Sequence, residues 1–291
     1  VPTPAQVTRI EQALASGEEL PEGVERRADG AFFVAVDRRV RARSGTYFRT
    51  VRQTFVNKAE TAPVPVPSMH GEALGKEMKL PLAFVHLNKG AYLFCPGSRG
   101  LVACGRAGRH ARFPVAGLGK VGVLSYVRGA GGYWAPRTAV RVARIRQRPA
   151  QVEPTARWVH FDLKEQVMVA YQGDRPVYAT LISSGKEGYD TPTGLFNIYT
   201  KWVSHRMAGV DDKDGPYDID EVPWVMFYRN SYAVHGAYWH NTFGNVRSHG
   251  CTNLSPADAR WLFYWTDNRV PRGWHGLNVG KGKGTVFLIT N

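Results

Sequence analysis

The chain has no apolar run of about 18 residues, the length that a membrane-spanning helix needs. It also has no signal-peptide pattern, since it begins with the polar stretch VPTPAQ, and we expect the signal segment to be absent from this chain. Neither CxxC nor HExxH occurs, so two common zinc-binding spacings are missing. The sequence therefore predicts no transmembrane segment and offers no strong metal motif.

Acidic residues are missing from one part of the chain. Residues 101–150 contain ten Lys and Arg but no Asp or Glu, and residues 1–150 carry 24 basic and 10 acidic side chains. Residues 151–291 carry 14 of each, so the net charge of +14 lies entirely in the first half. Such a charge favours an anionic polymer or surface as partner, although a merely soluble basic face is the alternative. We expect no nucleic acid among the binding partners, because no helix-turn-helix or zinc-finger pattern occurs.

Only three cysteines occur, Cys95, Cys104 and Cys251, and an odd number leaves at least one thiol free. Cys95 and Cys104 flank PGSRGLVA, whose Pro and Gly residues indicate a turn between apolar runs. A disulfide across a hairpin fits this spacing if the compartment is oxidising, and two reduced core cysteines are the alternative. With the bridge formed, Cys251 is the remaining thiol.

Length and pattern predict a mainly β protein of two domains. Residues 1–150 form a basic, β-rich domain that opens with a helix over about 4–16, capped by Thr3 and started by Pro4. Short β-like runs follow, and the similar stretches 46–56 and 125–135 resemble SH3-like modules. The proline-containing segment QRPAQVEPT marks the boundary, and residues 156–291 form the second domain.

The second half contains alternating strands joined by a tight turn at QGDR, then a second turn at TPTG. The acidic stretch DDKDGPYDIDE, residues 211–221, predicts a solvated flexible loop that would also suit a lid. A calcium loop is the weaker alternative, since Val210 stands where the first Asp ligand belongs. Its candidate ligands and turn residue are Asp212, Asp214, Gly215, Asp218 and Glu221.

The stretch HGAYWHNTFGNVRSHGCTN carries the main chemical signal. Cys251 follows Gly250 in a sharp turn, and a helix begins just after it with Ser255 as N-cap and Pro256 at its first position. The helix dipole would lower the pKa of the thiol. His235 at the end of an apolar strand could take its proton, and the N–H groups of Gly250 and Cys251 could bind an oxyanion. This pattern favours a Cys–His nucleophilic site.

Two alternatives stay open at this point. His235, His240, His249 and Cys251 could together supply ligands for zinc, although their spacing matches no common zinc motif. A buried inert thiol fits poorly beside so many polar groups.

The same residues give the sequence a family resemblance. His235-Gly236, twelve residues before Ser248-His249-Gly250-Cys251-Thr252-Asn253, resembles the signature of the L,D-transpeptidase catalytic domain family, YkuD type. The first hairpin, the TPTG turn and the final strand GTVFLIT are similar too, so the resemblance covers about residues 157–291. Thr252 stands where an aliphatic residue is usual, and Gly236 where some members have Ser. The resemblance implies a β-sandwich catalytic domain with a short helix after the cysteine.

What the resemblance implies about function is specific. Cys251 would attack the L,D-peptide bond of a peptidoglycan tetrapeptide stem with His235 as base and His249 orienting it. D-Ala would leave, a thioester would form, and an amine of a second stem would complete a 3→3 cross-link. The residues expected around the turn are Ser248, Gly250, Thr252 and Asn253, and those expected to meet substrate are Gly236, Tyr238, Trp239 and Arg247, with Arg247 on a stem carboxylate.

The resemblance also bears on cofactors, location and alternatives. No cofactor or metal is needed, and the protein is expected in the periplasm or cell envelope, where a Cys95–Cys104 disulfide is reasonable. The basic first half would hold the enzyme on the anionic wall or on outer-membrane lipid. Two other functions remain: an L,D-carboxypeptidase or hydrolase with the same site, and a non-catalytic wall-binding protein.

Overall fold

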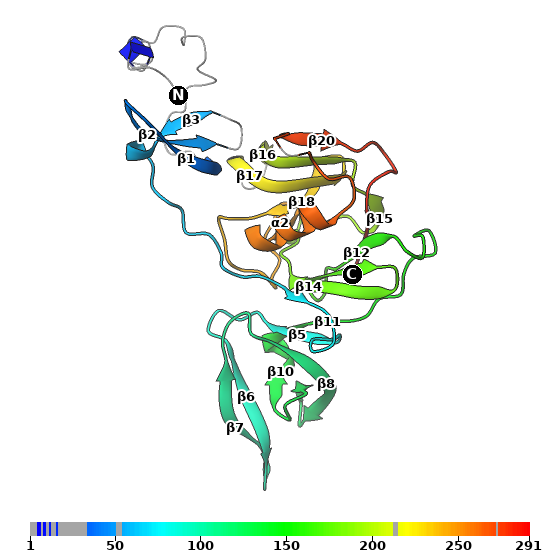
Figure 1. Ribbon diagram of the computed structural model, residues 1–291. Coiled ribbons are helices and arrows are strands. Elements are labelled where there is room, and N and C mark those ends of the chain that lie inside the picture. The colour runs from blue at the N-terminus through cyan, green and yellow to red at the C-terminus, as the bar shows by residue number, and fades with distance from the viewer. Residues whose placement is uncertain are drawn as a thin grey trace. The chain divides into compact units, whose positions relative to one another are not determined.

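The computed structural model describes residues 34–50, 54–211, 215–271 and 273–291, with six residues near the N-terminus (Figure 1). Those six are helical: Ala5, Gln6, Thr8, Arg9, Gln12 and Ser16. Thr3 and Pro4, expected to begin that helix, lie outside the described residues. The chain divides into two compact units, residues 1–65 with 203–222, and residues 66–202 with 223–291.

The first unit contains a small antiparallel sheet in the order β1-β2-β3. Its elements are β1 (Val36–Ala42), β2 (Gly45–Thr50), β3 (Phe55–Asn57) and the 3-10 turn η1 (Lys58–Glu60). Tyr47 of β2 is buried, and its hydroxyl donates a hydrogen bond to Ser44 Oγ in the β1–β2 turn (3.2 Å). This hairpin is part of the β-rich region that the sequence predicts.

Two long neighbouring strands, β16 (Thr200–Asp211) and β17 (Gly215–Arg229), replace most of the predicted acidic loop. The prediction of a flexible loop or lid is wrong for residues 215–221, which are strand. The alternating acids of DIDE have the period of a strand as well as the composition of a loop. Glu221, a calcium ligand in the weaker alternative, accepts a hydrogen bond from Ser204 Oγ (2.6 Å). Asp212 and Asp214 lie outside the described residues.

Residues 82–143, in the second unit, form a seven-stranded antiparallel sheet in the order β11-β5-β8-β9-β10-β6-β7. Its elements are β5 (Leu82–Val85), β6 (Ala91–Gly97), β7 (Gly100–Ala107), β8 (Arg112–Val121), β9 (Leu124–Gly129), β10 (Trp134–Pro136), η2 (Arg137–Ala139) and β11 (Val140–Ala143). We call residues 82–143 the basic module, because they contain no Asp or Glu. The module has an apolar core of its own that includes Val85, Phe113 and Val127.

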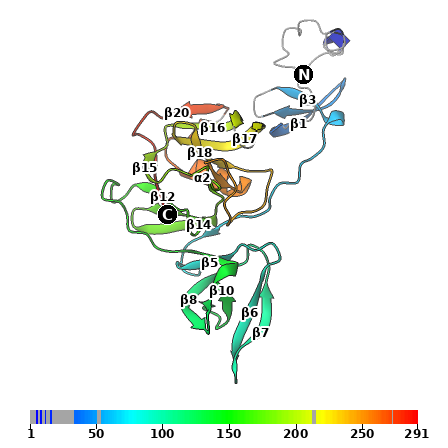
Figure 2. The same ribbon diagram turned by 180° about the vertical axis from the view of Figure 1, so that it is seen from behind.

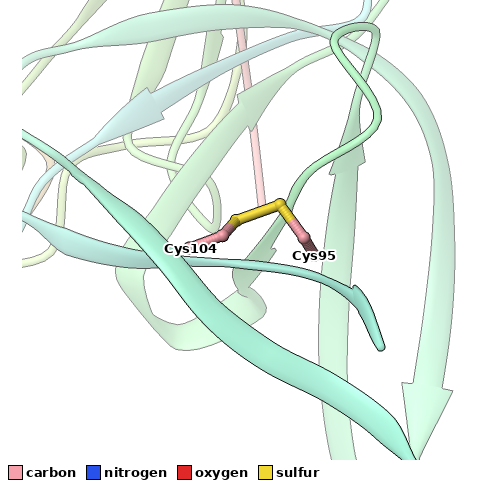
Figure 3. The surroundings of a disulfide bond; sticks show 2 residues. All are labelled: Cys95 and Cys104. Carbon is pink, nitrogen blue, oxygen red and sulfur yellow. A yellow bond between two sulfur atoms is a disulfide. The ribbon is translucent and has the colours of Figure 1, made fainter. Parts of the chain in front are cut away.

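A disulfide joins Cys95 of β6 to Cys104 of β7, with 5.7 Å between the Cα atoms (Figure 3). The predicted bridge is therefore present, and Cys251 is the free cysteine. The two similar stretches of sequence also share a local fold. Residues 46–56 contain the antiparallel pair β2–β3, and residues 125–135 contain the antiparallel pair β9–β10.

The rest of the second unit contains two sheets. The first has the order β15-β21-β12-β13-β14-β4, formed by β4 (Glu72–Ala73), β12 (Arg157–Asp162), β13 (Val167–Gln172), β14 (Arg175–Leu181), β15 (Gly194–Asn197) and β21 (Val286–Thr290). The second has the order β19-β18-β17-β16-β20, with β18 (Tyr232–Gly236), β19 (Thr252–Leu254) and β20 (Gly276–Asn278). The rings of Tyr228 on β17 and Phe287 on β21 meet at 6.0 Å between centroids, so the two sheets face each other as a sandwich.

Helix α2 (Pro256–Trp265) follows β19 and packs on β18 (Figure 2). It begins as predicted: Ser255 is the N-cap and accepts a hydrogen bond from the Asp258 N–H (3.1 Å), and Pro256 is the first helical residue. The fold is thus mainly β, with a short helix after Cys251, as the sequence predicts. No helix among the described residues has the length and apolar character to cross a bilayer.

The basic module and the sandwich share a second apolar core within this unit. Leu82 and Phe84 of β5 pack with sandwich residues such as Trp158. Glu165 of the sandwich forms ion pairs with Arg137 and Arg144, the latter at 2.9 Å. The predicted domain boundary at residues 147–155 stays a prediction.

Candidate functional site

Cys251 lies in the turn between Ser248 and β19, and its side chain is partly buried. Its Sγ donates a weak hydrogen bond to the Ser231 carbonyl oxygen (3.7 Å). Burial raises the pKa of the thiol to about 11, and the nearby N–H of Ala233 opposes that rise only in part. The expectation that the helix dipole lowers this pKa is wrong. Three strand residues separate Cys251 from the N-cap of α2, and desolvation outweighs the dipole.

His235 is the fourth residue of β18 and is fully buried. Strand β18 runs parallel to β19 with His235 opposite Asn253. Asn253 therefore lies on the same face of the pair as His235. Cys251 lies in the turn that leads into β19, two residues before Asn253.

The ring of His235 has a defined tautomer. Its Nδ1 lies 3.2 Å from the Gly236 carbonyl oxygen, which can only accept, so Nδ1 carries the proton and Nε2 has a free lone pair. Burial lowers the pKa of His235 to about 4, so the ring is neutral near pH 7. The sequence predicted that His249 orients this ring, but the hydrogen bond that fixes it is made by Gly236.

The turn at residues 248–251 is held by several polar contacts. Ser248 Oγ donates to the Cys251 carbonyl oxygen and accepts from the Gly250 N–H (3.1 Å). Gly250 has φ +114°, and a Cβ there would lie 2.7 Å from Cε1 of Tyr232. Thr191 Oγ1 donates to the Gly250 carbonyl oxygen (2.8 Å). The Gly250 N–H, one of the two predicted oxyanion donors, is thus already occupied.

Thr191 was missed as a functional residue, although it begins the TPTG turn. Its hydroxyl also accepts a hydrogen bond from the Gly185 N–H (2.9 Å), so it ties the segment after β14 to the cysteine turn. The Ser248 N–H donates to the Ser184 carbonyl oxygen (3.0 Å) in the same segment. No local pattern signals these contacts, because the partners lie about 60 residues apart in the chain.

His249 and His240 have different surroundings. His249 is exposed, and its ring packs edge-on against Tyr189 with 4.7 Å between centroids. His240 is buried: its Nδ1 accepts from the Thr242 N–H (3.3 Å), and its Nε2 lies 3.0 Å from the side-chain amide of Asn253. Because Nδ1 accepts, Nε2 must donate, so we assign the Asn253 amide with its oxygen toward His240. Asn253 therefore holds His240.

The zinc alternative loses support from these contacts, since both ring nitrogens of His240 have hydrogen-bond partners. Within the described ranges, no group of three or more His, Cys, Asp or Glu side chains has a metal-binding arrangement.

Aromatic side chains lie beside His235. Trp239 has its ring 5.8 Å from that of His235, and Tyr238 meets Trp239 edge-on at 5.0 Å. Tyr228, which the sequence did not single out, is buried, and its pKa is raised by burial and by the neighbouring Cys251. Tyr238 and Trp239 are partly buried, and Tyr228 is buried.

The remaining predicted residues have structural contacts or exposed positions. A Cβ on Gly236 would lie 3.0 Å from Pro223 and 3.3 Å from Ala259, so glycine lets α2 approach β18. Thr252 is buried on β19. Arg247 has an exposed side chain, and its backbone N–H donates to Ser184 (2.8 Å).

Comparison with known proteins gives a family match. The sequence model of the L,D-transpeptidase catalytic domain (YkuD) matches residues 156–286. No curated protein matches the chain. The L,D-transpeptidase catalytic domain of Enterococcus faecium is similar at 26% identity, covering 47% of this chain and 98% of that one, with a TM-score of 0.37.

Two further solved structures show the extent of the likeness. The L,D-transpeptidase of Stackebrandtia nassauensis is 21% identical over 48% of this chain, with a TM-score of 0.34, and the match spans 58% of that protein's length. L,D-transpeptidase 3 of Mycobacterium tuberculosis is 18% identical over 55% of this chain and 74% of its own, with a TM-score of 0.38. The family match includes His235 and the whole cysteine turn, so residues 156–286 are similar to the L,D-transpeptidase catalytic domains of the YkuD family.

Proposed function

We propose that this protein is a cysteine-dependent L,D-transpeptidase that acts on peptidoglycan tetrapeptide stems. One observation carries the proposal: the free thiol of Cys251 lies in the turn that leads into β19, and β19 is paired with β18, which carries a neutral, buried His235 whose Nδ1 holds the proton. A thiol beside such a base is the arrangement that nucleophilic acyl transfer requires. The family match supplies the substrate class.

The two pKa values determine how the thiol is activated. A thiol with a pKa of about 11 and an imidazole with a pKa of about 4 remain neutral together at pH 7. The proton therefore moves from Sγ to Nε2 of His235 as the sulfur attacks the carbonyl carbon of the L,D bond. His235 then returns that proton to the nitrogen of D-Ala, which leaves, and a thioester remains on Cys251.

The second half of the reaction repeats these transfers in reverse. A side-chain amine of another stem attacks the thioester carbonyl and gives a proton to Nε2, and Sγ leaves and regains it. The product is a 3→3 cross-link. The Cys251 N–H binds the oxyanion in this scheme, because Ser248 occupies the Gly250 N–H. Ser248, Thr252 and Asn253 hold the turn, and His249 with Tyr238, Trp239 and Arg247 contacts the stem.

Incubation with a disaccharide-tetrapeptide, followed by mass spectrometry, tests the proposal. We expect a tetrapeptide–tripeptide dimer and free D-Ala from the wild-type chain, and neither from Cys251→Ala. Tripeptide alone would identify an L,D-carboxypeptidase that uses water as acceptor. No product from the wild-type chain would overturn the proposal and favour a wall-binding protein.

We propose a location in the cell envelope, where an oxidising compartment keeps the Cys95–Cys104 bridge. The basic module is proposed to bind the anionic wall or outer-membrane lipid. Lys120 and Arg128 are exposed on this module, so their replacement by Gln should weaken binding to sacculi or to anionic vesicles. Co-sedimentation at low and high salt measures the effect, and unchanged binding to both would show that the module has another role.

A further inference from the structure

Arg109 lies in a tight turn of the basic module, between β7 and β8. The turn is bonded to β5 at Val85 in both directions: the His110 N–H donates to Val85 O, and the Val85 N–H donates to Ala111 O, each at 2.8 Å. His110 closes the turn with φ +62°, which is a left-handed conformation. The backbone of Arg109 therefore has a fixed position relative to β5.

The end of β5 contacts the segment that follows His235. His86 Nδ1 lies 3.1 Å from Asn245 Oδ1, and Arg141 Nε donates to the Gly244 carbonyl oxygen (2.8 Å). A Cβ on Gly244 would lie 2.5 Å from the Cβ of His86, so the two backbones approach as closely as glycine allows. These contacts fix the turn of Arg109 relative to residues 237–247, which carry His240 and Arg247.

The guanidinium of Arg109 lacks partners that buried donors normally have. Its Nε and Nη2 atoms are buried and make no hydrogen bond with any described residue. Burial and the charges of Arg247, His235 and Arg109 together lower the pKa of His240 to about 4, in agreement with the backbone contacts that bring the turn of Arg109 toward residues 237–247. These two donors, without a partner among the described residues on a partly buried side chain, are open to a ligand.

The shape of the unpaired edge indicates the ligand. Nε and Nη2 form one side of the planar guanidinium, and two parallel N–H groups on that side match the two oxygens of a carboxylate. His240 is hydrogen-bonded to Asn253, which lies opposite His235 on β19. His240 is therefore connected through a single hydrogen bond to the strand pair β18–β19, which carries His235 and begins just after Cys251.

We propose that Arg109, with Arg247, binds a carboxylate of the stem peptide and so makes the basic module part of the substrate site. The inference rests on the proposed function, because it names the group of the substrate that this part of the site recognises. A tetrapeptide stem offers a terminal carboxylate and carboxylates on its acidic residues. All of these groups are carboxylates. Stems in which one carboxylate at a time is converted to an amide show which of them Arg109 binds.

Turnover of these stems by the full-length chain tests the proposal. Arg109→Gln should lower kcat/KM about 10- to 100-fold on the free stem, mainly through KM, because a bidentate charged contact is lost. On the stem whose recognised carboxylate is amidated, wild type and Arg109→Gln should have equal kcat/KM. Arg109→Lys should restore activity only in part, since an ammonium group cannot form two parallel bonds. Arg106→Gln is the matched control: it removes an exposed charge from the same module and should leave kcat/KM unchanged.

Calorimetry separates this site from the catalytic step. In the Cys251→Ala chain, which cannot turn over, Arg109→Gln should weaken binding of the free stem by a similar factor. If Arg109→Gln lowers kcat/KM equally on every stem, Arg109 has a structural role. If Arg109→Gln leaves KM and affinity unchanged, only water occupies the site. Either result overturns the proposal. If wild type makes no product but Cys251→Ala still binds the stem through Arg109, the proposed reaction fails and the carboxylate site stands.

Discussion

The reactivity of Cys251 toward iodoacetamide tests the neutral thiol–imidazole pair directly. Alkylation requires the thiolate, and a pKa of about 11 leaves roughly one thiolate in 10,000 at pH 7. An unperturbed cysteine of pKa about 8.5 has about 3% thiolate at that pH, about 300 times more. A thiolate of higher pKa is about tenfold more nucleophilic over this difference, so Cys251 should react about 30-fold more slowly. The rate should rise about tenfold with each pH unit between pH 7 and 10.

The measurement is mass spectrometry of the Cys251 peptide after timed labelling, with the unfolded, non-reduced chain as reference. Cys95 and Cys104 stay in their disulfide and give no label. His235→Ala should change the rate little, because a neutral ring does not stabilise the resting thiolate. Fast labelling that is constant between pH 6 and 8, and that is lost in His235→Ala, would show an ion pair and refute the reasoning.

Two stability predictions concern residues around the site. Gly250→Ala should lower the free energy of unfolding by about 2 kcal/mol or more, because φ is +114° and the new Cβ would lie 2.7 Å from Tyr232. Urea titration measures this loss, and a loss below about 0.5 kcal/mol would contradict the reasoning. Asp258→Ala should cost about 3 kcal/mol or more, since the buried carboxylate accepts from the Gly71 N–H and the hydroxyls of Tyr178 and Thr180, each at 2.7 Å. Differential scanning calorimetry measures that cost, with Asp174→Ala, an exposed carboxylate, as control.

Local signals in the sequence were sufficient for some features of the site. Ser255 and Pro256 begin α2 as predicted, because capping depends on neighbouring residues only. The hairpin of Cys95 and Cys104 follows from a turn between two apolar runs. That His235 and Cys251 meet was predicted from a motif and stays a prediction, which the parallel pairing of β18 with β19 supports.

Features that depend on tertiary burial were not predictable in the same way. The pKa of Cys251 has the opposite shift from the one expected, because desolvation is a property of the packed site and the dipole argument considers one helix. Thr191 supports the cysteine turn from about 60 residues away, and the proposed role of Arg109 depends on the contact between His86 and Asn245. Residues 215–221 are strand because they pair with β16, which composition does not reveal.

For the activity and location proposed above, the high pKa of Cys251 has a consequence. A thiolate is the form that oxidants and disulfides attack, so a thiol kept protonated by burial is protected while no substrate is bound. The same chain keeps Cys95 and Cys104 bridged, which requires the surroundings that would threaten an exposed thiolate. Nucleophilicity also increases with thiol pKa, so the sulfur that forms during attack is a stronger nucleophile than a low-pKa thiolate. Burial therefore gives up resting reactivity and gains both protection and a reactive sulfur at the moment when His235 removes the proton.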